Sequence, residues 1–319
     1  MRILTTCLAA AAVTAVLTVP AAAAPQLLAR EQAPFTAAAA RGVVAWSAFD
    51  PGTGRYRLKL LRDGTVSTPA IADRGAPFDV DLGRLTGGNV GAVYSRCADD
   101  EVRGGCDLHL FDLDAGRERK LTSVSSPSRS ELHPSLDGGQ VAFARRYGER
   151  TVLYRGPIDG EPSSDRQPSP RQGGVDDLEL NVNRLYYVWA DEGGTEFGRD
   201  SLYRVSGDRA VRMYATESGG ANASDFIGLT YTGGYVYFGE TNNGSGTGNR
   251  LYRATTGGGR LQETIGSPSF LSADWTGDRF VTASGYDGCE ANSNDPPQAS
   301  DCLLERTDQI TWRPATKLP

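Results

Sequence analysis

The sequence predicts an all-β protein that folds as a single six-bladed β-propeller of four-stranded antiparallel blades. Two columns of apolar residues recur with a shared period of ~49 residues, a spacing typical of blade-like β-repeats. Turn signals rich in Gly and Asp separate the columns, and these residues supply the left-handed backbone that short hairpins require. Each unit is therefore a four-stranded meander, and six such sheets can bury their faces by packing around a ring.

The most regular column is a strand that contains the triplet Leu-Tyr-Arg. It occupies residues 153–155, 202–204 and 251–253, and weaker copies begin at Leu58, Leu108 and Leu304. The second column precedes it and carries a large aromatic residue in most units: Trp46, Tyr94, Phe143, Tyr187 and Phe238. We expect these aromatic side chains to fill the interfaces between blades.

The other two strands of each unit are shorter. A first strand is expected near Phe78, Leu132, Leu178, Phe226 and Leu271, and a last strand such as Val211–Tyr214 follows the Leu-Tyr-Arg strand. Closure of the ring has two interpretations. Residues 309–314 suit the fourth strand of blade six, whereas Gln26–Ala29 either adds a strand to that blade or forms a tail.

The N-terminus predicts a secretory signal peptide over residues 1–24, followed by an N-terminal segment (25–34) and the propeller domain (35–319). Arg2 provides the positive end, Ile3–Val19 the apolar core and Ala21–Ala24 the small residues of a cleavage site. No other segment is apolar enough to span a membrane. We therefore expect an extracytoplasmic protein, secreted or in the cell envelope, that has no membrane span after cleavage and is monomeric.

Four cysteines lie outside the signal peptide, and an even number in an exported chain predicts disulfides. Three pairings are compatible with the sequence alone. Alignment on the repeat selects Cys97–Cys106 and Cys289–Cys302, because each pair flanks the loop between the second and third strands of one blade, blade two or blade six. The closely spaced cysteine pairs of zinc sites are missing.

Composition argues against several functions. The net charge of −6 and the pI of about 5.1 oppose nonspecific binding to nucleic acid. His109 and His133 are the only histidines, no G-x-S-x-G motif occurs, and we expect structural roles for both histidines. Residues 112–116 begin like a calcium loop but lack its closing glutamate, so we interpret them as a hairpin turn. No cofactor and no metal are expected.

One stretch also carries a family resemblance. Residues 133–143 resemble the repeat of TolB-type, WD40-like propellers, whose core reads roughly P-x-W-S-P-D-G-x-x-I-A-F. Pro134, Asp137, Gly138, Val141, Ala142 and Phe143 match it once a gap after the proline is allowed. The resemblance implies an exported propeller of a class used mostly for binding. TolB has an α/β domain before its propeller, whereas this chain reaches blade one almost at once, so a Tol–Pal role is not implied.

Two features point to a binding surface. Glu131, Asp177 and Asp225 each directly precede a first strand, where a ring would bring them to the mouth of its channel as a funnel for a cation or a basic group. The alternative is that they are solvated loop acids. Long loops between second and third strands occur at Ser95–Asp107, Ala190–Ser201, Glu240–Asn249 and Ser284–Asp301. They should emerge on one face with the blade-to-blade connections, and loops on a rigid scaffold are where recognition concentrates.

The sequence thus favours an exported, non-catalytic binding or scaffold propeller that recognises a protein, peptide or glycan through one loop face. An alternative is an exported propeller hydrolase or lyase that uses the channel-mouth carboxylates. A structural component of the cell surface is a third interpretation, and it predicts neither a pocket nor a cluster of binding residues.

Overall fold

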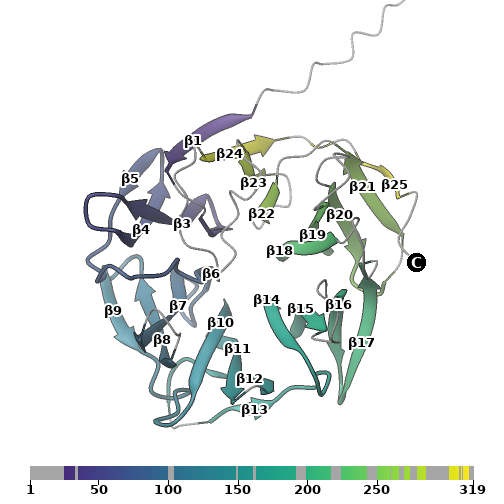
Figure 1. The fold of residues 1–319 in the computed structure, drawn as a ribbon, viewed down its shortest axis with the longest axis horizontal. Helices are drawn as coiled ribbons and strands as arrows, with labels where there is room; N and C mark the ends of the chain where they lie inside the picture. Colours follow the sequence, from purple (N-terminus) through teal and green to yellow (C-terminus); the bar gives the residue numbers. More distant parts are fainter. Residues whose placement is uncertain are drawn as a thin grey trace, which may run out of the picture.

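The computed structural model is a ring of six antiparallel β-sheets around a central axis, which confirms the predicted six-bladed propeller (Figure 1). It describes residues 25–32, 35–99, 104–148, 150–160, 163–191, 199–216, 224–242, 250–258, 260–265, 269–273, 279–284, 302–308, 310 and 312–315. Every regular element in these ranges is a strand, and they contain no helix long and apolar enough to cross a membrane. The expected signal peptide lies outside the described residues.

The blades follow one another along the chain. Blade one contains β2 (Ala37–Ala40), β3 (Val43–Asp50), β4 (Arg55–Arg62) and β5 (Thr65–Ser67); blade two β6 (Asp81–Arg84), β7 (Val90–Asp99), β8 (Gly104–Asp112) and β9 (Arg117–Lys120); blade three β10 (Ser130–Asp137), β11 (Gln140–Tyr147), β12 (Arg150–Pro157) and β13 (Asp165–Arg166); blade four β14 (Gly174–Asn181), β15 (Arg184–Asp191), β16 (Arg199–Ser206) and β17 (Arg209–Ala215). Blade five contains β18 (Ser224–Thr232), β19 (Tyr235–Asn242), β20 (Arg250–Thr255), β21 (Leu261–Ile265) and β25 (Arg313–Pro314), and blade six β22 (Ser269–Ala273), β23 (Arg279–Ser284), β24 (Cys302–Asp308) and β1 (Gln26–Glu31).

The second strand of each blade forms the centre of the packing. In β3 the residues from Val43 to Ala48 are all buried, because this strand has a blade on each side, whereas β4 alternates between buried and more exposed residues. The predicted aromatic column is confirmed as interblade core: Trp46, Tyr94, Phe143, Tyr187 and Phe238 are each at most 1% exposed. The propeller is therefore held together mainly by apolar burial between neighbouring sheets.

The ring closes through the N-terminal strand, which settles the open question of closure. β1 pairs antiparallel with β24, so residues of the predicted N-terminal segment 25–34 supply the outermost strand of blade six. The expectation that residues 309–314 form the fourth strand of blade six is wrong, because β25 instead pairs with β21 as a fifth strand of blade five. Since β1 and β24 come from the two ends of the propeller, their pairing joins both ends within one blade.

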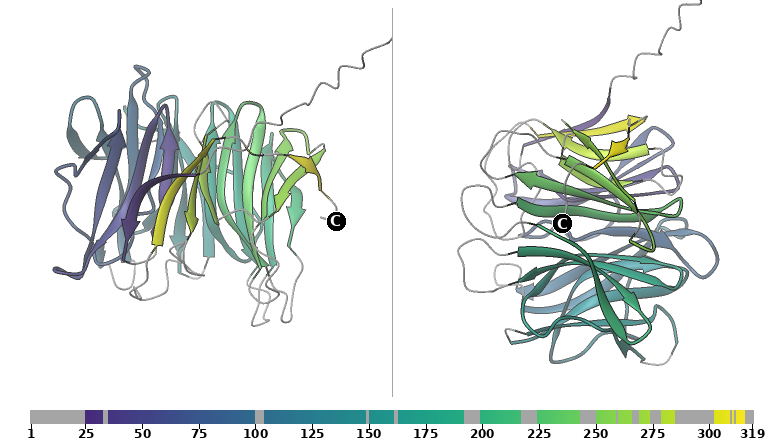
Figure 2. Two further views of the ribbon diagram at one scale, coloured as in Figure 1. Left: turned by 90° about the horizontal axis from the view of Figure 1, so that it is seen from above. Right: turned by 90° about the vertical axis from the view of Figure 1, so that its right-hand side faces the viewer.

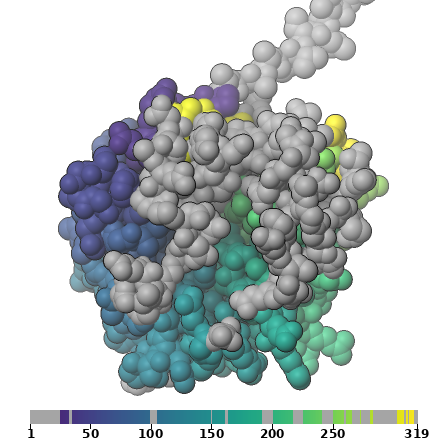
Figure 3. Space-filling model, viewed as in Figure 1, coloured from purple at the N-terminus to yellow at the C-terminus, as the bar shows by residue number. Residues whose placement is uncertain are grey.

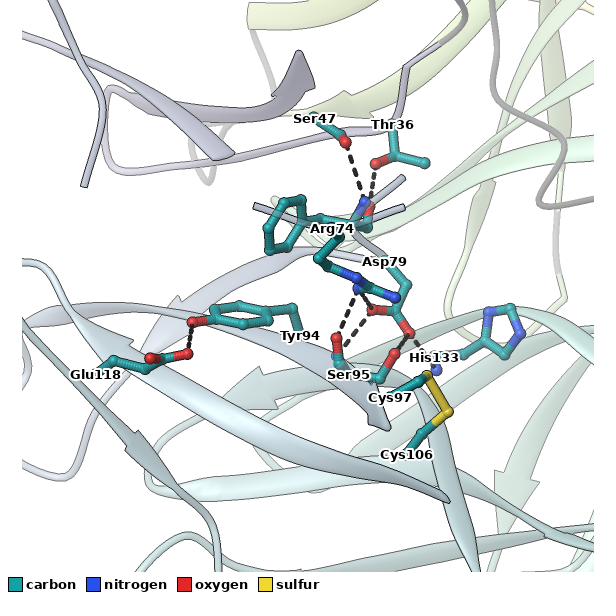
Figure 4. Close-up of polar contacts among 11 residues, drawn as sticks. Thr36, Ser47, Arg74, Asp79, Tyr94, Ser95, Cys97, Cys106, Glu118 and His133 are labelled. Carbon is teal, nitrogen blue, oxygen red and sulfur yellow. Dashed lines mark hydrogen bonds and ion pairs between the residues drawn. A yellow bond between two sulfur atoms is a disulfide. The ribbon is translucent and has the colours of Figure 1, made fainter. Parts of the chain in front are cut away.

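The first strands surround the axis, and side chains of one blade cap the backbone of the next. Asp81 Oδ2 accepts a hydrogen bond from the Leu136 N–H (2.8 Å), and Ser135 Oγ accepts one from the Leu180 N–H (2.8 Å). The same kind of contact is made by Ser47 with Phe78 N–H, Asp79 with His133 N–H, Asp137 with Val182 N–H, Asp200 with Phe226 N–H and Ser272 with Ala39 N–H. Figure 4 shows Asp79 between Ser95 of its own blade and His133 of the next. These caps satisfy backbone donors that have no neighbouring strand to pair with.

The strands β7 and β8 of blade two are longer than the sequence suggests, and we call the hairpin that they form, with its disulfide, the stapled hairpin. Residues 95–107 were expected to be a loop, but β7 continues to Asp99 and β8 begins at Gly104, so Cys97 and Cys106 are paired strand residues. The predicted Cys97–Cys106 disulfide is present. Cys302, in β24, is also disulfide-bonded, while its predicted partner Cys289 lies outside the described residues, and that pairing stays a prediction.

The strands run across the thickness of the disc, so the turns emerge on two opposite faces (Figure 2). One face carries the turns from second to third strands together with the connections between blades, and we call it the hairpin face. The opposite face carries the turns from first to second and from third to fourth strands, such as 137–140 and 206–209. Most residues of the three other predicted long loops (192–198, 243–249 and 285–301) lie outside the described residues.

Candidate binding site

A pocket of about 510 Å³ opens on the hairpin face between blades two and three. Its walls come from the start of β8, the end of β9, the connection that leads into β10, and the hairpin between β11 and β12. The lining residues are Gly105, Asp107, Lys120, Ser126, Pro127, Ser128, Arg129, Ser130, Arg146 and Gly148. This volume lies in the range of sites for small ligands. Figure 3 shows the molecule along the ring axis, with blades two and three in blue and teal.

The pocket has a positively charged lining. Lys120 Nζ lies 2.6 Å from Asp107 Oδ2, so this cation of the pocket is already paired with an acid. The Arg129 guanidinium lies over the Tyr147 ring, 4.9 Å from its centroid, at the distance of a cation–π contact. Arg146 lies on β11 opposite Ser130 in the β10–β11 register and is exposed. Among the described residues, neither of these two arginines forms an ion pair, so the lining carries more positive than negative charge.

Several contacts tie the segment that lines the pocket to its neighbours. Ser130 is buried, and its Oγ accepts a hydrogen bond from the Cys106 N–H (3.3 Å), which ties the connecting segment to the stapled hairpin. Next to it, Glu131 is fully buried and its Oε1 lies 2.9 Å from Nε of Arg145. Arg145 also donates to the Val124 carbonyl (2.6 Å). A disulfide and an ion pair therefore fix the segment that presents the serines.

Glu131 does not have the position that the sequence suggested. It lies inside β10 rather than ahead of it. Because Glu131 is buried against Arg145, its own carboxylate is not accessible to a ligand. Burial raises the pKa of Glu131 to about 7, although Arg145 acts in the opposite direction. In the described structure Glu131 therefore does not line the pocket, and its ion pair with Arg145 holds β10 next to β11 behind the pocket wall.

Asp177 and Asp225 also lie within strands, β14 and β18, instead of directly before them. Asp177 accepts backbone hydrogen bonds from Leu178 (2.8 Å) and from Leu229 of the next blade, so it caps the blade four to blade five junction. Its neighbour Asp176 occupies the β-bulge of β14 and is exposed. A bulge changes the direction in which a side chain points.

A second group of carboxylates gathers near the hairpin face of blades four and five. Asp176, Asp200 and Asp225 interact electrostatically with one another, and Asp200, at the start of β16, is buried. Desolvation, and then repulsion from Asp176, raises the pKa of Asp200 to about 8. Although the Asp176 side chain keeps contact with solvent, desolvation by the surrounding protein, and then repulsion from Asp225, raises its pKa to about 6. Only Asp225 of this group was singled out from the sequence.

The described residues contain no group of three or more His, Cys, Asp or Glu arranged to hold a metal ion. Asp112 Oδ1 accepts hydrogen bonds from the N–H groups of Asp114 (3.0 Å) and Ala115 (2.9 Å), which gives residues 112–116 the hairpin turn expected of them.

The two histidines belong to polar networks that connect strands. His109 Nδ1 lies 3.2 Å from Glu118 Oε1, which also accepts a hydrogen bond from the Tyr94 hydroxyl (2.5 Å). Burial lowers the pKa of His109. His133 lies in the bulge of β10 with a left-handed backbone (φ 48°) and donates its N–H to Asp79.

Sequence reasoning missed the pocket. Its cations come from β9, the β9–β10 connection and β11, so no local motif contains them. The one signal in the sequence is the serine-rich connection, with serines at 123, 125, 126, 128 and 130. Trp189, in β15, is 2% exposed and donates its indole N–H to the Gln172 carbonyl (2.6 Å).

No protein-family model matches the chain, and no curated protein matches it. Solved structures do match. TolB from Acinetobacter baumannii has a TM-score of 0.55 at 15% identity, over 85% of this chain and 65% of TolB. A Mycobacterium tuberculosis puromycin-hydrolyzing peptidase has a TM-score of 0.54 at 14% identity, over 91% of this chain and 53% of the peptidase. An alpha-L-arabinanase from Penicillium chrysogenum has a TM-score of 0.52 at 13% identity, over 91% of this chain and 99% of the arabinanase.

At such low identity these similarities concern the fold alone, and the chain spans less than two thirds of the TolB and peptidase structures. The same architecture occurs in TolB and in hydrolases, so it is compatible with either function. The chain therefore has a six-bladed β-propeller fold similar to that of TolB.

Proposed function

We propose that this protein is a non-catalytic binding propeller that recognises a protein, peptide or glycan through its hairpin face. The observation that carries the proposal is the pocket between blades two and three, which lies on this face and has a polar lining tied to the disulfide-linked β7–β8 hairpin. A rigid site loses little conformational entropy when a ligand binds. The acid within the pocket is engaged, because Asp107 is paired with Lys120, which favours recognition over acid–base chemistry there.

We also infer that the protein acts outside the cytoplasm as a monomer. The Cys97–Cys106 disulfide supports an oxidising compartment, where such bonds persist. The expected signal peptide agrees with this location.

The hairpin face can be tested by blocking it. The mature protein is first screened on glycan and peptide arrays, and its best ligand is measured again with a bulky polyethylene glycol maleimide on Ser128→Cys. Binding should be lost, because Ser128 lines the pocket. The matched control places the same group on Asp208→Cys, in the turn between β16 and β17 on the opposite face, where the side chain is 97% exposed. Equal binding by both conjugates would show that the ligand is recognised elsewhere.

A second candidate function is a hydrolase or lyase that uses carboxylates at the mouth of the channel. The cluster of Asp176, Asp200 and Asp225 favours it, because carboxyl groups with raised pKa values can serve as general acids. A panel of polysaccharides and esters assayed with the wild type and Asp200→Asn tests it. Turnover that disappears in the variant would favour the enzyme, and no turnover by the wild type would remove this candidate.

A further inference from the structure

We propose that the pocket between blades two and three binds the oxyanion of a small acidic ligand, a carboxylate or a phosphate. This inference rests on the proposed binding function of the hairpin face and specifies the chemistry recognised there. Its first support is charge: Lys120, Arg129 and Arg146 line the pocket against a single acid, Asp107, so three cations and one anion leave two positive charges. The whole chain has a net charge of −6, so this concentration of positive charge runs against the overall composition.

The second support is the state of the two arginines. Among the described residues, neither Arg129 nor Arg146 forms an ion pair, whereas some arginines of blades two and three are paired, for example Arg84 with Asp137 and Arg145 with Glu131. The Arg129 guanidinium carbon lies over the Tyr147 ring, 4.9 Å from its centroid, and a cation–π contact does not use the N–H groups as donors to an oxygen acceptor. Guanidinium edges match carboxylate and phosphate oxygens in pairs of parallel hydrogen bonds.

The third support is the remaining lining. Ser126 and Ser128 provide hydroxyl groups on the wall that carries Arg129, and the stapled hairpin keeps this wall in position through the contact of Ser130 with Cys106. The volume of about 510 Å³ accommodates a molecule the size of a sugar or a small acid, not a bare ion alone. The ligand is therefore expected to present its anion to the arginines and its polar groups to the serines.

Four probes test this inference by isothermal titration calorimetry on the mature protein at 50 mM NaCl: glucuronate, its uncharged methyl ester, glucose 6-phosphate and glucose. At least one anionic sugar should bind ~10-fold or more tightly than its neutral counterpart, which corresponds to about 1.4 kcal/mol. Tighter binding of glucuronate would identify a carboxylate ligand, and tighter binding of glucose 6-phosphate a phosphate ligand. Raising the salt to 500 mM should weaken the anionic probe selectively.

The variants use charge-matched controls. Arg129→Gln with Arg146→Gln should abolish the preference for the anion, and Arg129→Lys with Arg146→Lys should retain part of it, since lysine keeps the charge but not the paired hydrogen bonds. The control, Arg117→Gln with Arg209→Gln, removes two exposed arginines near turns of the opposite face and should bind like the wild type. Equal binding of charged and neutral probes by the wild type, or an unchanged preference in the Arg129→Gln, Arg146→Gln variant, would overturn the inference. The array experiment keeps the two proposals apart. If the anion preference fails this test but the polyethylene glycol conjugate of Ser128→Cys no longer binds the ligand found on the arrays, binding by the hairpin face is supported and only the recognition of an anion is refuted.

Discussion

The first strands of neighbouring blades approach each other so closely near the axis of the ring that one additional side-chain atom can cause a clash. At Gly83, in β6, an added Cβ would lie 1.6 Å from the Leu136 carbonyl oxygen of blade three. No side chain can relieve this clash, because the opposing atom belongs to the backbone. Glycine is therefore required at this position by the approach of two blades, and not by its own backbone conformation.

We predict that Gly83→Ala lowers the free energy of unfolding by about 1–3 kcal/mol or more, since it forces blades two and three apart. Urea unfolding followed by tryptophan fluorescence measures the change. Gly87→Ala is the control, because an added Cβ there meets nothing within 4 Å and the change should be close to neutral. Equal stability of both variants would mean that the blades can separate at no cost.

At the scale of elements, β1 is the strand that closes the ring. Its last residue, Glu31, is buried, accepts a hydrogen bond from the Trp46 indole N–H (2.7 Å) and lies 3.9 Å from Lys59 Nζ. Leu28 and Ala29 of the same strand pack against the cluster that contains Trp46 and Leu304. The N-terminal strand thus joins blade six to blade one by both polar and apolar contacts.

Glu31→Ala should lower the free energy of unfolding by about 1–3 kcal/mol, because it leaves the buried Trp46 N–H without an acceptor. Glu31→Gln keeps an oxygen for this bond and should cost less. Arg30→Ala, in the same strand but exposed, should change little. Chemical unfolding of the three variants checks the order, and a Glu31→Ala variant as stable as Arg30→Ala would contradict a role for Glu31 in closure.

The staple of the β7–β8 hairpin should also contribute to stability. Replacing both Cys97 and Cys106 by Ala removes a cross-link between residues nine positions apart, and the chain-entropy account assigns a loop of this length about 2–3 kcal/mol. Thermal unfolding by circular dichroism measures the loss. If the pocket depends on the staple, the variant should also bind the preferred anionic probe more weakly, whereas unchanged stability and binding would make the disulfide incidental.

At the scale of the whole molecule, buried and partly buried carboxyl groups around the axis make stability depend on pH. Desolvation raises the pKa of Asp81 to about 7 and that of Asp177 to about 8, and that of Asp200 also reaches about 8. The ordinary value for Asp is about 4. Between pH 4 and 8 the folded protein therefore binds more protons than the unfolded chain, so these groups favour folding at low pH and lose this effect as the pH rises.

We predict that the protein is more stable at pH 5.5 than at pH 8.5, measured as the free energy of unfolding in urea. Asp177→Asn should reduce the difference, because the amide oxygen can still accept the Leu178 N–H but no longer titrates. Asp208→Asn, at a 97% exposed position, should leave the difference unchanged. Stability that increases from pH 5.5 to 8.5 would contradict the raised pKa values.

Much of the architecture could be predicted because it repeats. Trp46, Tyr94 and Phe143 occupy the same place in successive blades, so each copy confirms the others, and the Cys97–Cys106 pairing followed from the same alignment. The candidate site could not be predicted in this way. Glu131 has the sequence context of a channel residue, yet its strand register places it against Arg145 in the interior.

The sequence by itself determined the all-β class, the number of blades, the interblade aromatic core and the blade-two staple, because each depends on local patterns that recur along the chain. The tertiary structure alone decided which end of the chain closes the ring, since β1 finds its partner β24 more than 270 residues away. It also decided the pocket, whose cations Lys120, Arg129 and Arg146 meet only when two blades pack side by side. Contacts between distant segments depend on how the edges of the sheets fit together, and no periodic pattern in the sequence records that fit.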